Sequence, residues 1–145
     1  PKVKKAVFNS FVNSHGIMKD QFRTLVHPSA TVASSAILGP GVYIEPGSII
    51  SPFARLGFGV TINRSVSIGH HTTVKDFSMI NPGCHIAGNC TIGQEVQLGI
   101  GTVVFNEKSI GDTSIVGGGS VVTSNIESNV IAWGNPCKVV KPVSA

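Results

Sequence analysis

The chain has 145 residues, of which 12% are charged and 41% are hydrophobic, and its formal net charge is +4. This composition excludes a disordered chain, and no apolar run reaches the roughly 18 residues of a membrane-spanning helix. The positive charge reflects scarce acidic residues rather than a long basic run, so we expect no nucleic-acid partner. Three cysteines form no disulfide framework and no signal-peptide pattern opens the chain, so we expect a cytoplasmic protein.

Residues 1–25 differ in pattern from the rest of the chain. Val3, Val7 and Phe11 lie four positions apart, which is the spacing of an amphipathic helix. The pattern stops near Gly16, a residue that commonly ends helices. We therefore predict a short linker or capping helix, and we expect it to pack across the open end of the domain that follows.

A six-residue repeat fills residues 26–127. At every sixth position from Val26 to Val122, all seventeen residues are Val, Ile or Leu, and the next residue is Gly in seven of the seventeen hexads. The fifth position of each hexad is Ala, Ser, Cys, Thr or Val, with Lys108 and Ile126 as the exceptions. A period of six fits a short strand followed by a bend, and three such units close one triangular coil. We predict an all-β protein, a parallel β-helix of about six coils.

Residues 128–145 are predicted to form a C-terminal loop and tail. The repeat breaks at Ser128 and Asn129, and Gly134 and Pro136 favour a loop over residues 131–136. A last short strand is predicted from Cys137 to Lys141.

The uninterrupted hexads, of the form [Leu/Ile/Val]-Gly-x-x-small-x, resemble those of the hexapeptide-repeat acyltransferases, whose fold is a left-handed parallel β-helix. The tail sequence Gly-Asn-Pro-Cys-Lys-Val at 134–139 resembles the closing Gly-Asn-Pro-Ala-Lys-Val signature of that family, with Cys137 in place of the usual alanine. Residues 24–30, 62–71 and 76–83 are similar to one subfamily, the bacterial sialic-acid O-acetyltransferases and nucleotide-linked 4-amino-sugar N-acetyltransferases.

This resemblance implies acetyl-CoA as co-substrate, a sugar or nucleotide-sugar acceptor, and a homotrimer that binds CoA between neighbouring β-helices. Such enzymes take part in bacterial surface-glycan biosynthesis. Members usually carry an N-terminal nucleotide-sugar-binding domain, so we expect this chain to be the acyltransferase half alone. The tail would then close the coenzyme A site.

Acetyl transfer from a thioester needs a general base, a donor that stabilises the oxyanion, and a groove for CoA. His70 lies two residues past the inward-facing Ile68, so we expect it at an outer corner. The resemblance assigns His70 as the base. It also places His71 where the family has an acidic residue, and Asp76 or a backbone carbonyl could compensate for the missing negative charge.

The resemblance further implies a set of binding residues, of which the cofactor-binding ones are Met79, Gly88, Ile100, Gly118 and Lys138, and the acceptor-binding ones are Asn63 and His27. The backbone N–H of Gly88 would meet the thioester carbonyl, and Lys138 would meet the phosphates. From the residues alone, each position also has a structural interpretation as a core residue, a turn, a corner cap or a solvated tail.

The predicted function is acetyl transfer from acetyl-CoA to the amine of a nucleotide-linked 4-amino-sugar, with His70 as base. The alternatives are O-acetylation of a sugar or of sialic acid, and a non-catalytic β-helix scaffold. A zinc hydratase of the γ-carbonic-anhydrase type requires a His-x-x-x-x-His spacing that His70, His71 and His85 do not have, so we expect no metal. Acetylation of serine or an antibiotic is disfavoured, because such relatives usually interrupt the coils with an extruded loop.

Overall fold

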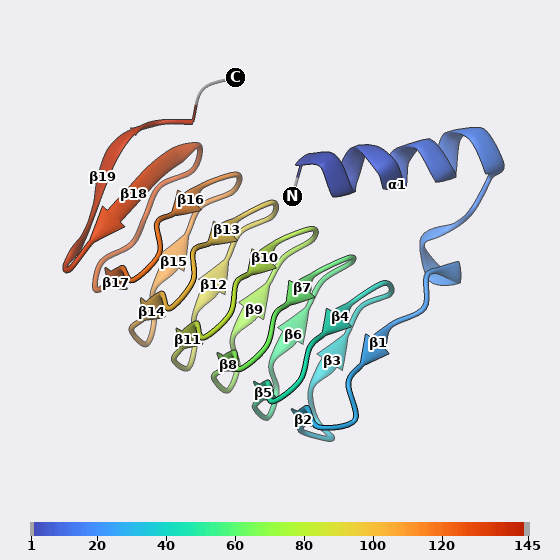
Figure 1. The fold of residues 1–145 in the computed structure, drawn as a ribbon, viewed down its shortest axis with the longest axis horizontal. Helices are drawn as coiled ribbons and strands as arrows, with labels where there is room; N and C mark the ends of the chain where they lie inside the picture. The colour runs from blue at the N-terminus through green and yellow to red at the C-terminus, as the bar shows by residue number, and fades with distance from the viewer. Residues whose placement is uncertain (1, 144–145) are drawn as a thin grey trace.

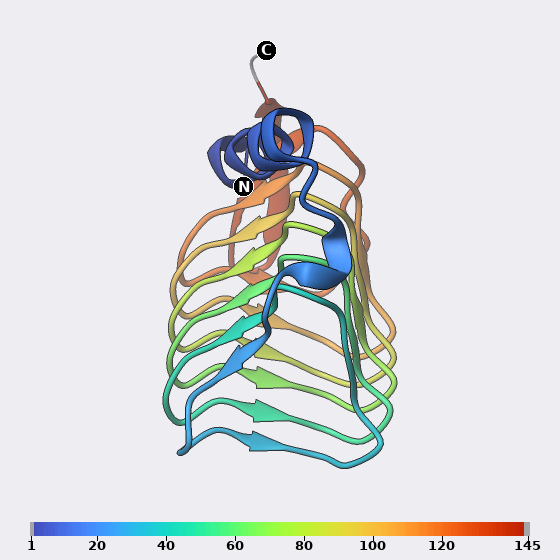
Figure 2. The ribbon, with the colours of Figure 1, turned by 90° about the vertical axis from the view of Figure 1, so that its right-hand side faces the viewer.

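Each hexad forms one strand of two residues, and the strands wind into the predicted left-handed parallel β-helix (Figure 1). The computed structural model describes residues 2–143. From β1 to β17, neighbouring strands within each face lie 18 residues apart and in register, as Ile44 pairs with Ile62. Seen from the N-terminal end, the coils are triangular and stack along one axis (Figure 2). The predicted fold class is therefore confirmed.

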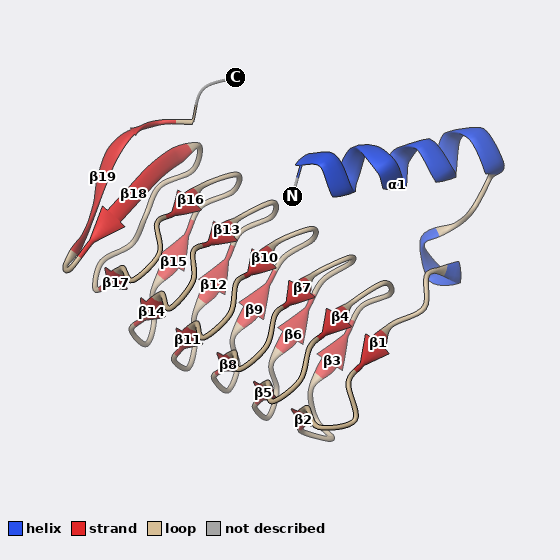
Figure 3. Ribbon diagram, viewed as in Figure 1, coloured by secondary structure: helices blue, strands red, loops and turns tan. Residues whose placement is uncertain are grey.

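Three sheets form the faces of the solenoid (Figure 3). Sheet A contains β1 (Leu25–Val26), β4 (Tyr43–Ile44), β7 (Thr61–Ile62), β10 (Met79–Ile80), β13 (Gln97–Leu98), β16 (Ile115–Val116), β18 (Val130–Gly134) and β19 (Cys137–Pro142). Sheet B contains β2 (Thr31–Val32), β5 (Ile49–Ile50), β8 (Ser67–Ile68), β11 (His85–Ile86), β14 (Val103–Val104) and β17 (Val121–Val122). Sheet C contains β3 (Ile37–Leu38), β6 (Arg55–Leu56), β9 (Thr73–Val74), β12 (Thr91–Ile92) and β15 (Ser109–Ile110).

The core is the stack of aliphatic residues at the second position of each strand. Ile44, Ile62, Ile80 and Leu98 are fully buried and lie one above another in sheet A. Small residues fill the corners, and buried hydroxyls there bond to main-chain carbonyls. Because strand and turn lengths are constant, every outer corner presents a column of residues 18 positions apart.

The helix α1 (Lys2–His15) forms as predicted, but its predicted position across the open end is wrong. It runs along the turns that join sheet C to sheet A (Figures 1 and 2). Phe8 packs against Phe22, Phe58 and Phe77, with ring centroids 4.4–5.6 Å apart. Two of these rings, Phe58 and Phe77, project from consecutive turns of this corner and form the apolar surface on which the helix packs.

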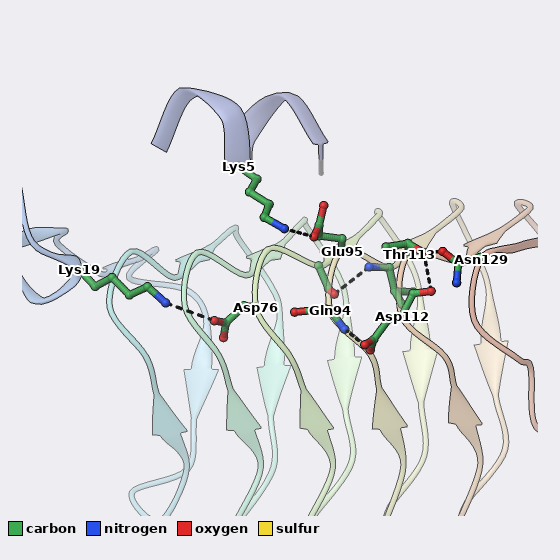
Figure 4. Close-up of polar contacts among 10 residues, drawn as sticks. Lys5, Lys19, Asp76, Gln94, Glu95, Asp112, Thr113 and Asn129 are labelled. Atoms are coloured by element: carbon green, nitrogen blue, oxygen red, sulfur yellow. Dashed lines mark hydrogen bonds and ion pairs between the residues drawn. The ribbon is translucent and has the colours of Figure 1, made fainter. Parts of the chain in front are cut away.

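Two lysines fix the helix further. Lys4 Nζ donates to Gly59 O and Thr61 Oγ1, both at 2.7 Å, and Lys5 Nζ lies 2.5 Å from Glu95 Oε1 (Figure 4). The short 3-10 helix η1 (Lys19–Gln21) then leads into β1. The first coil stays partly uncovered, and Val26 is 41% exposed.

The C-terminal segment corrects the loop predicted over 131–136. Residues 130–134 form β18, which pairs in parallel with β16, and only the Asn135–Pro136 turn separates it from β19. Ala132 is fully buried opposite Val116, so it continues the inner stack of sheet A. These two partners are 16 positions apart in the sequence, whereas partners in the earlier coils are 18 apart. The predicted final strand is confirmed as β19, which pairs antiparallel with β18.

Within residues 2–143, no helix has the length and apolar character needed to cross a membrane.

Candidate active site

His70 and His71 lie in the turn that joins β8 of sheet B to β9 of sheet C, at the outer corner predicted for His70. Both side chains are exposed, and their Nδ1 atoms are 3.1 Å apart. In a hydrogen bond between two imidazoles, one nitrogen donates and the other accepts. The backbone of His71 adopts a φ of +56°, and its ring lies 4.9 Å from the ring of Phe53 one coil earlier. Phe53 therefore helps to orient the neighbour of the predicted base.

The ring of His70 rests on Gly88, the equivalent residue of the next coil. A Cβ placed on Gly88 would lie 2.6 Å from both Cε1 and Nε2 of His70, so only glycine leaves room for the imidazole. The N–H of Gly88 has no hydrogen-bond acceptor among residues 2–143. When the Nδ1 of His70 donates to His71, its Nε2 keeps a lone pair beside Gly88. This arrangement can accept a proton next to a free backbone donor.

A cavity of about 310 Å³ adjoins this corner on sheet B, and it is lined in part by Ser67, His85, Phe105 and Asn106. Ser67 Oγ and His85 Nδ1 lie 2.8 Å apart. Neither a sequence motif nor the family resemblance points to these residues or to Phe53. The 18-residue spacing provides the missing signal, because Asn106 follows Gly88 by one coil and Phe53 precedes His71 by one coil.

The predicted acceptor residues lie on the corner between sheets A and B. Asn63 Nδ2 donates to Ile80 O at 3.0 Å and lies 3.4 Å from Asn81 Oδ1, so the side chain caps the corner as well as facing outward. His27 heads the first coil, where its Nδ1 lies 2.9 Å from Ser29 Oγ.

Two of the predicted cofactor residues share that same corner. Ile100 is 63% exposed, and its carbonyl accepts a hydrogen bond from Gly119 N–H at 2.8 Å. A Cβ on Gly118 would lie 3.1 Å from Ile100 O, so the two positions are in contact.

Gly88 lies at the His70 corner, and the last two predicted cofactor residues, Met79 and Lys138, lie on sheet A, in β10 and β19. The chain thus brings His70, His71 and Gly88 together, and it places the remaining predicted site residues on a second corner and on sheet A.

Asp76 does not compensate for the missing acidic partner of His70. It lies at the corner between sheets C and A, where its Oδ1 accepts from Phe58 N–H at 2.9 Å and its Oδ2 lies 3.8 Å from Lys19 Nζ (Figure 4). Among residues 2–143, no carboxylate bonds to His70 or His71. His71 can therefore orient His70 but supplies no negative charge.

The three cysteines are core residues, and Cys84 and Cys90 occupy the fifth, small position of their hexads. Cys84 and Cys90 are buried, and Cys84 Sγ lies 3.0 Å from Gly99 O. Burial raises the pKa of Cys84 and of Cys137 above the ordinary thiol value. The neutral thiol is a poor nucleophile, so neither residue is suited to carry an acyl group. No group of three or more His, Cys, Asp or Glu side chains is placed to hold a metal ion in the part of the chain that the structure describes.

Solved structures of acetyltransferases resemble this chain along nearly its whole length. A mutant of perosamine N-acetyltransferase from Caulobacter crescentus, in complex with CoA and GDP-perosamine, is 27% identical with a TM-score of 0.90. The acetyltransferase domain of PglB from Neisseria gonorrhoeae FA1090 is also 27% identical, with a TM-score of 0.89, and has been solved with acetyl coenzyme A as well. Each match covers 96% of this chain, but 64% and 66% of the respective solved chains.

Among curated proteins, galactoside O-acetyltransferase from Escherichia coli K12 is 47% identical over 36 residues. That match covers 25% of this chain and 18% of the enzyme. No family model matches the chain.

Proposed function

We propose that this chain transfers the acetyl group of acetyl-CoA to the amine of a nucleotide-linked 4-amino-sugar, with His70 as general base. The observation that carries the proposal is the position of His70, whose Nδ1 contacts His71 while its Nε2 lies over Gly88. The similarity to N-acetyltransferases across 96% of the chain supports it, and one of those structures holds both CoA and a nucleotide-linked sugar.

The chemical step follows from this geometry. Nε2 of His70 takes a proton from the sugar amine as the amine nitrogen attacks the thioester carbonyl carbon. The carbonyl oxygen gains negative charge, which the free N–H of Gly88 stabilises. The carbon–sulfur bond then breaks, and the imidazolium of His70 returns the proton to the departing CoA thiolate. His71 accepts the Nδ1–H bond throughout and so holds His70 in the tautomer with a free Nε2.

The complete site is proposed to form between neighbouring copies of a trimer. In such an arrangement, the corner between sheets A and B of one copy, with Asn63, Ile100 and Gly118, faces His70 of the next. Exposed apolar side chains beside the His70 corner support a covered surface there, since Ile49 is 50%, Phe53 56% and Phe105 48% exposed. Large apolar side chains that are exposed along one side of a protein are typical of a surface that another chain covers.

The test is the release of free thiol from acetyl-CoA in the presence of UDP-, dTDP- and GDP-linked 4-amino-sugars. The wild-type chain is compared with His70→Ala and with a control, His15→Ala, which removes an exposed histidine at the end of α1. Loss of the base is expected to lower kcat by about 10²- to 10⁴-fold, while the control keeps the wild-type rate. Wild-type turnover in His70→Ala contradicts the role of His70.

Sugar O-acetylation is the second candidate, because the curated match is to a galactoside O-acetyltransferase. The same assay with the matched 4-hydroxy sugars distinguishes it, since the two candidates differ only in the acceptor atom. A scaffold would bind no acetyl-CoA and release no thiol with any acceptor.

A further inference from the structure

The outer face of sheet C carries two neighbouring positive charges. The first residue of each strand and the residue that follows the strand point outward, because side chains alternate along a strand. In sheet C these positions hold Ile, Thr, Ser and Gly, apart from Arg55 and Lys75. Arg55 pairs in register with Thr73, and Lys75 lies two residues beyond Thr73, so both cations project from the same face of adjacent strands. Both are exposed, and neither forms an ion pair within residues 2–143.

These two cations border a cavity of about 390 Å³. Its lining includes Arg55, Gly57, Thr73, Lys75, Asp76 and Gln94. Gly57 has no side chain, so the outward position beside Lys75 on the preceding strand stays open. Thr73 adds a hydroxyl next to the two charges. The cavity therefore combines positive charge with hydrogen-bond donors on an open face of the solenoid.

One edge of the cavity holds a backbone donor without an acceptor. In the turns from sheet C to sheet A, Phe58 N–H donates to Asp76 Oδ1 and Gln94 N–H donates to Asp112 Oδ1, each at 2.9 Å (Figure 4). In both cases the acceptor is the carboxylate 18 positions later in the chain. Asp76 has Gln94 at that place, and Asp76 N–H has no acceptor among residues 2–143. This row of turns thus lacks one anionic oxygen, and the cavity lies where that oxygen would be.

The one acidic residue of the cavity lining already has its own partners. Asp76 Oδ1 accepts from Phe58 N–H, and Asp76 Oδ2 lies 3.8 Å from Lys19 Nζ (Figure 4). Arg55 and Lys75 remain without a counter-ion among the described residues, so the cavity has an excess of positive charge. Arginine binds phosphoryl oxygens through two parallel N–H bonds, and lysine binds them as a point charge. Two cations, a hydroxyl and a free backbone N–H match a diphosphate group, which has several negative charges and several acceptor oxygens.

We infer that this cavity on sheet C binds a diphosphate group. Arg55 and Lys75 hold its negative charges, and Asp76 N–H donates to one of its oxygens. The cavity contains none of the residues proposed for acetyl transfer, so the inference stands apart from the proposed function. The chemistry that is recognised is the diphosphate itself, whether free or as part of a nucleotide.

The test is calorimetric titration of the full chain with inorganic pyrophosphate at low salt. Arg55→Gln and Lys75→Gln are each expected to weaken binding about tenfold, since each removes a charge-assisted hydrogen bond. Arg64→Gln is the matched control, because it removes an exposed arginine from the corner between sheets A and B, and it should bind as the wild type does. Affinity should fall as salt rises, because exposed charges are screened.

Gln94→Asp tests the free donor directly. The new carboxylate can accept from Asp76 N–H, as Asp112 accepts from Gln94 N–H, so this variant is expected to lose pyrophosphate binding. Thermal unfolding checks that each variant remains folded. Equal pyrophosphate affinity in the wild type, Lys75→Gln and Gln94→Asp overturns the inference, and so does the absence of any heat of binding with pyrophosphate and UDP.

UDP and malonate identify the source and the class of the anion. UDP that binds more tightly than pyrophosphate, and that depends on Arg55 and Lys75, supports a nucleotide diphosphate, whereas equal affinity supports a free diphosphate. Malonate, a dicarboxylate, should bind more weakly than pyrophosphate, and equal affinity overturns the assignment to phosphate chemistry. None of these outcomes alters the thiol-release result, which tests the proposed function separately.

Discussion

The imidazole of His70 occupies the space that a side chain on Gly88 would fill, since a Cβ there would lie 2.6 Å from His70 Nε2. Gly88→Ala should displace the ring while changing little else in the coil. A misplaced catalytic group costs about 10²-fold in rate, so kcat should fall by about this factor. Steady-state kinetics measures the loss, and thermal unfolding checks that the solenoid remains folded. An unchanged kcat in a folded variant contradicts the assignment of His70 as base.

His71 lies where a carboxylate would stabilise the imidazolium that the proposed mechanism forms on His70. His71→Glu should therefore raise kcat, by about tenfold if the carboxylate reaches Nδ1 of His70. His71→Gln is the matched control, because its amide oxygen accepts the same hydrogen bond without a charge. Equal rates in the Glu and Gln variants would show that charge at this position has no part in catalysis.

Phe53 contacts the ring of His71 and does not contact the proposed reacting atoms. Phe53→Ala should free His71 and lower kcat several-fold, and Phe53→Leu should restore part of the rate through packing alone. The relevant measurement is kcat against KM for the acceptor, since a positioning residue affects the first more than the second. A change confined to KM assigns Phe53 to the acceptor surface instead.

Phe8 is the apolar anchor of α1, and it is 7% exposed between Phe22, Phe58 and Phe77. Phe8→Ala should cost about 3 kcal/mol of packing and release the helix, because buried aromatic truncations cost about 3–5 kcal/mol. Limited proteolysis is expected to cleave the variant within residues 2–24 and leave the coils intact. Phe11→Ala, on the exposed side of α1, should be cleaved no faster than wild type.

Burial lowers the pKa of Lys4 from its ordinary value of 10.5, and this gives the attachment of α1 a pH dependence. The folded state releases the proton of Lys4 at lower pH than the unfolded state does. Stability therefore rises with pH between the lowered folded pKa and 10.5. The free energy of unfolding from urea titrations should show this rise relative to Lys4→Met, which lacks the titrating group. Parallel pH profiles in the two proteins would contradict it.

The repeat could be predicted from the sequence because one position in six determines which way every strand faces. All seventeen strands from β1 to β17 end on an aliphatic residue of that series, so strand identity and register followed from spacing alone. The last coil could not be predicted in this way, because it reaches Ala132 after 16 residues and no hexad marks it. The position of α1 depends on Phe58 and Phe77. These residues lie at turn positions where the repeat does not restrict the residue type, so the repeat does not predict where the helix packs.

The candidate site was predictable to a similar degree. The 18-residue period accounts for the contact between Gly88 and His70, because Gly88 lies one coil after His70. The hydrogen bond between His70 and His71 depends on side-chain rotamers and on the positive φ of His71, which composition and spacing do not reveal. The remaining site residues lie on another corner and on sheet A because the coil has three sides. The resemblance implies a role for each position separately, and it does not show which positions lie on the same corner.

The contacts of α1 also bear on how the molecule loses its structure. A solenoid behaves as a one-dimensional array in which each coil depends on its immediate neighbours, so disorder enters from an uncovered end. The first coil, with Val26 partly exposed, is such an end. Lys4 donates a hydrogen bond to Gly59, and Lys5 contacts Glu95. The helix α1 therefore connects the coil before the His70 coil with the coil after it. We therefore expect fraying that starts at the first coil to stop before it reaches the histidine pair.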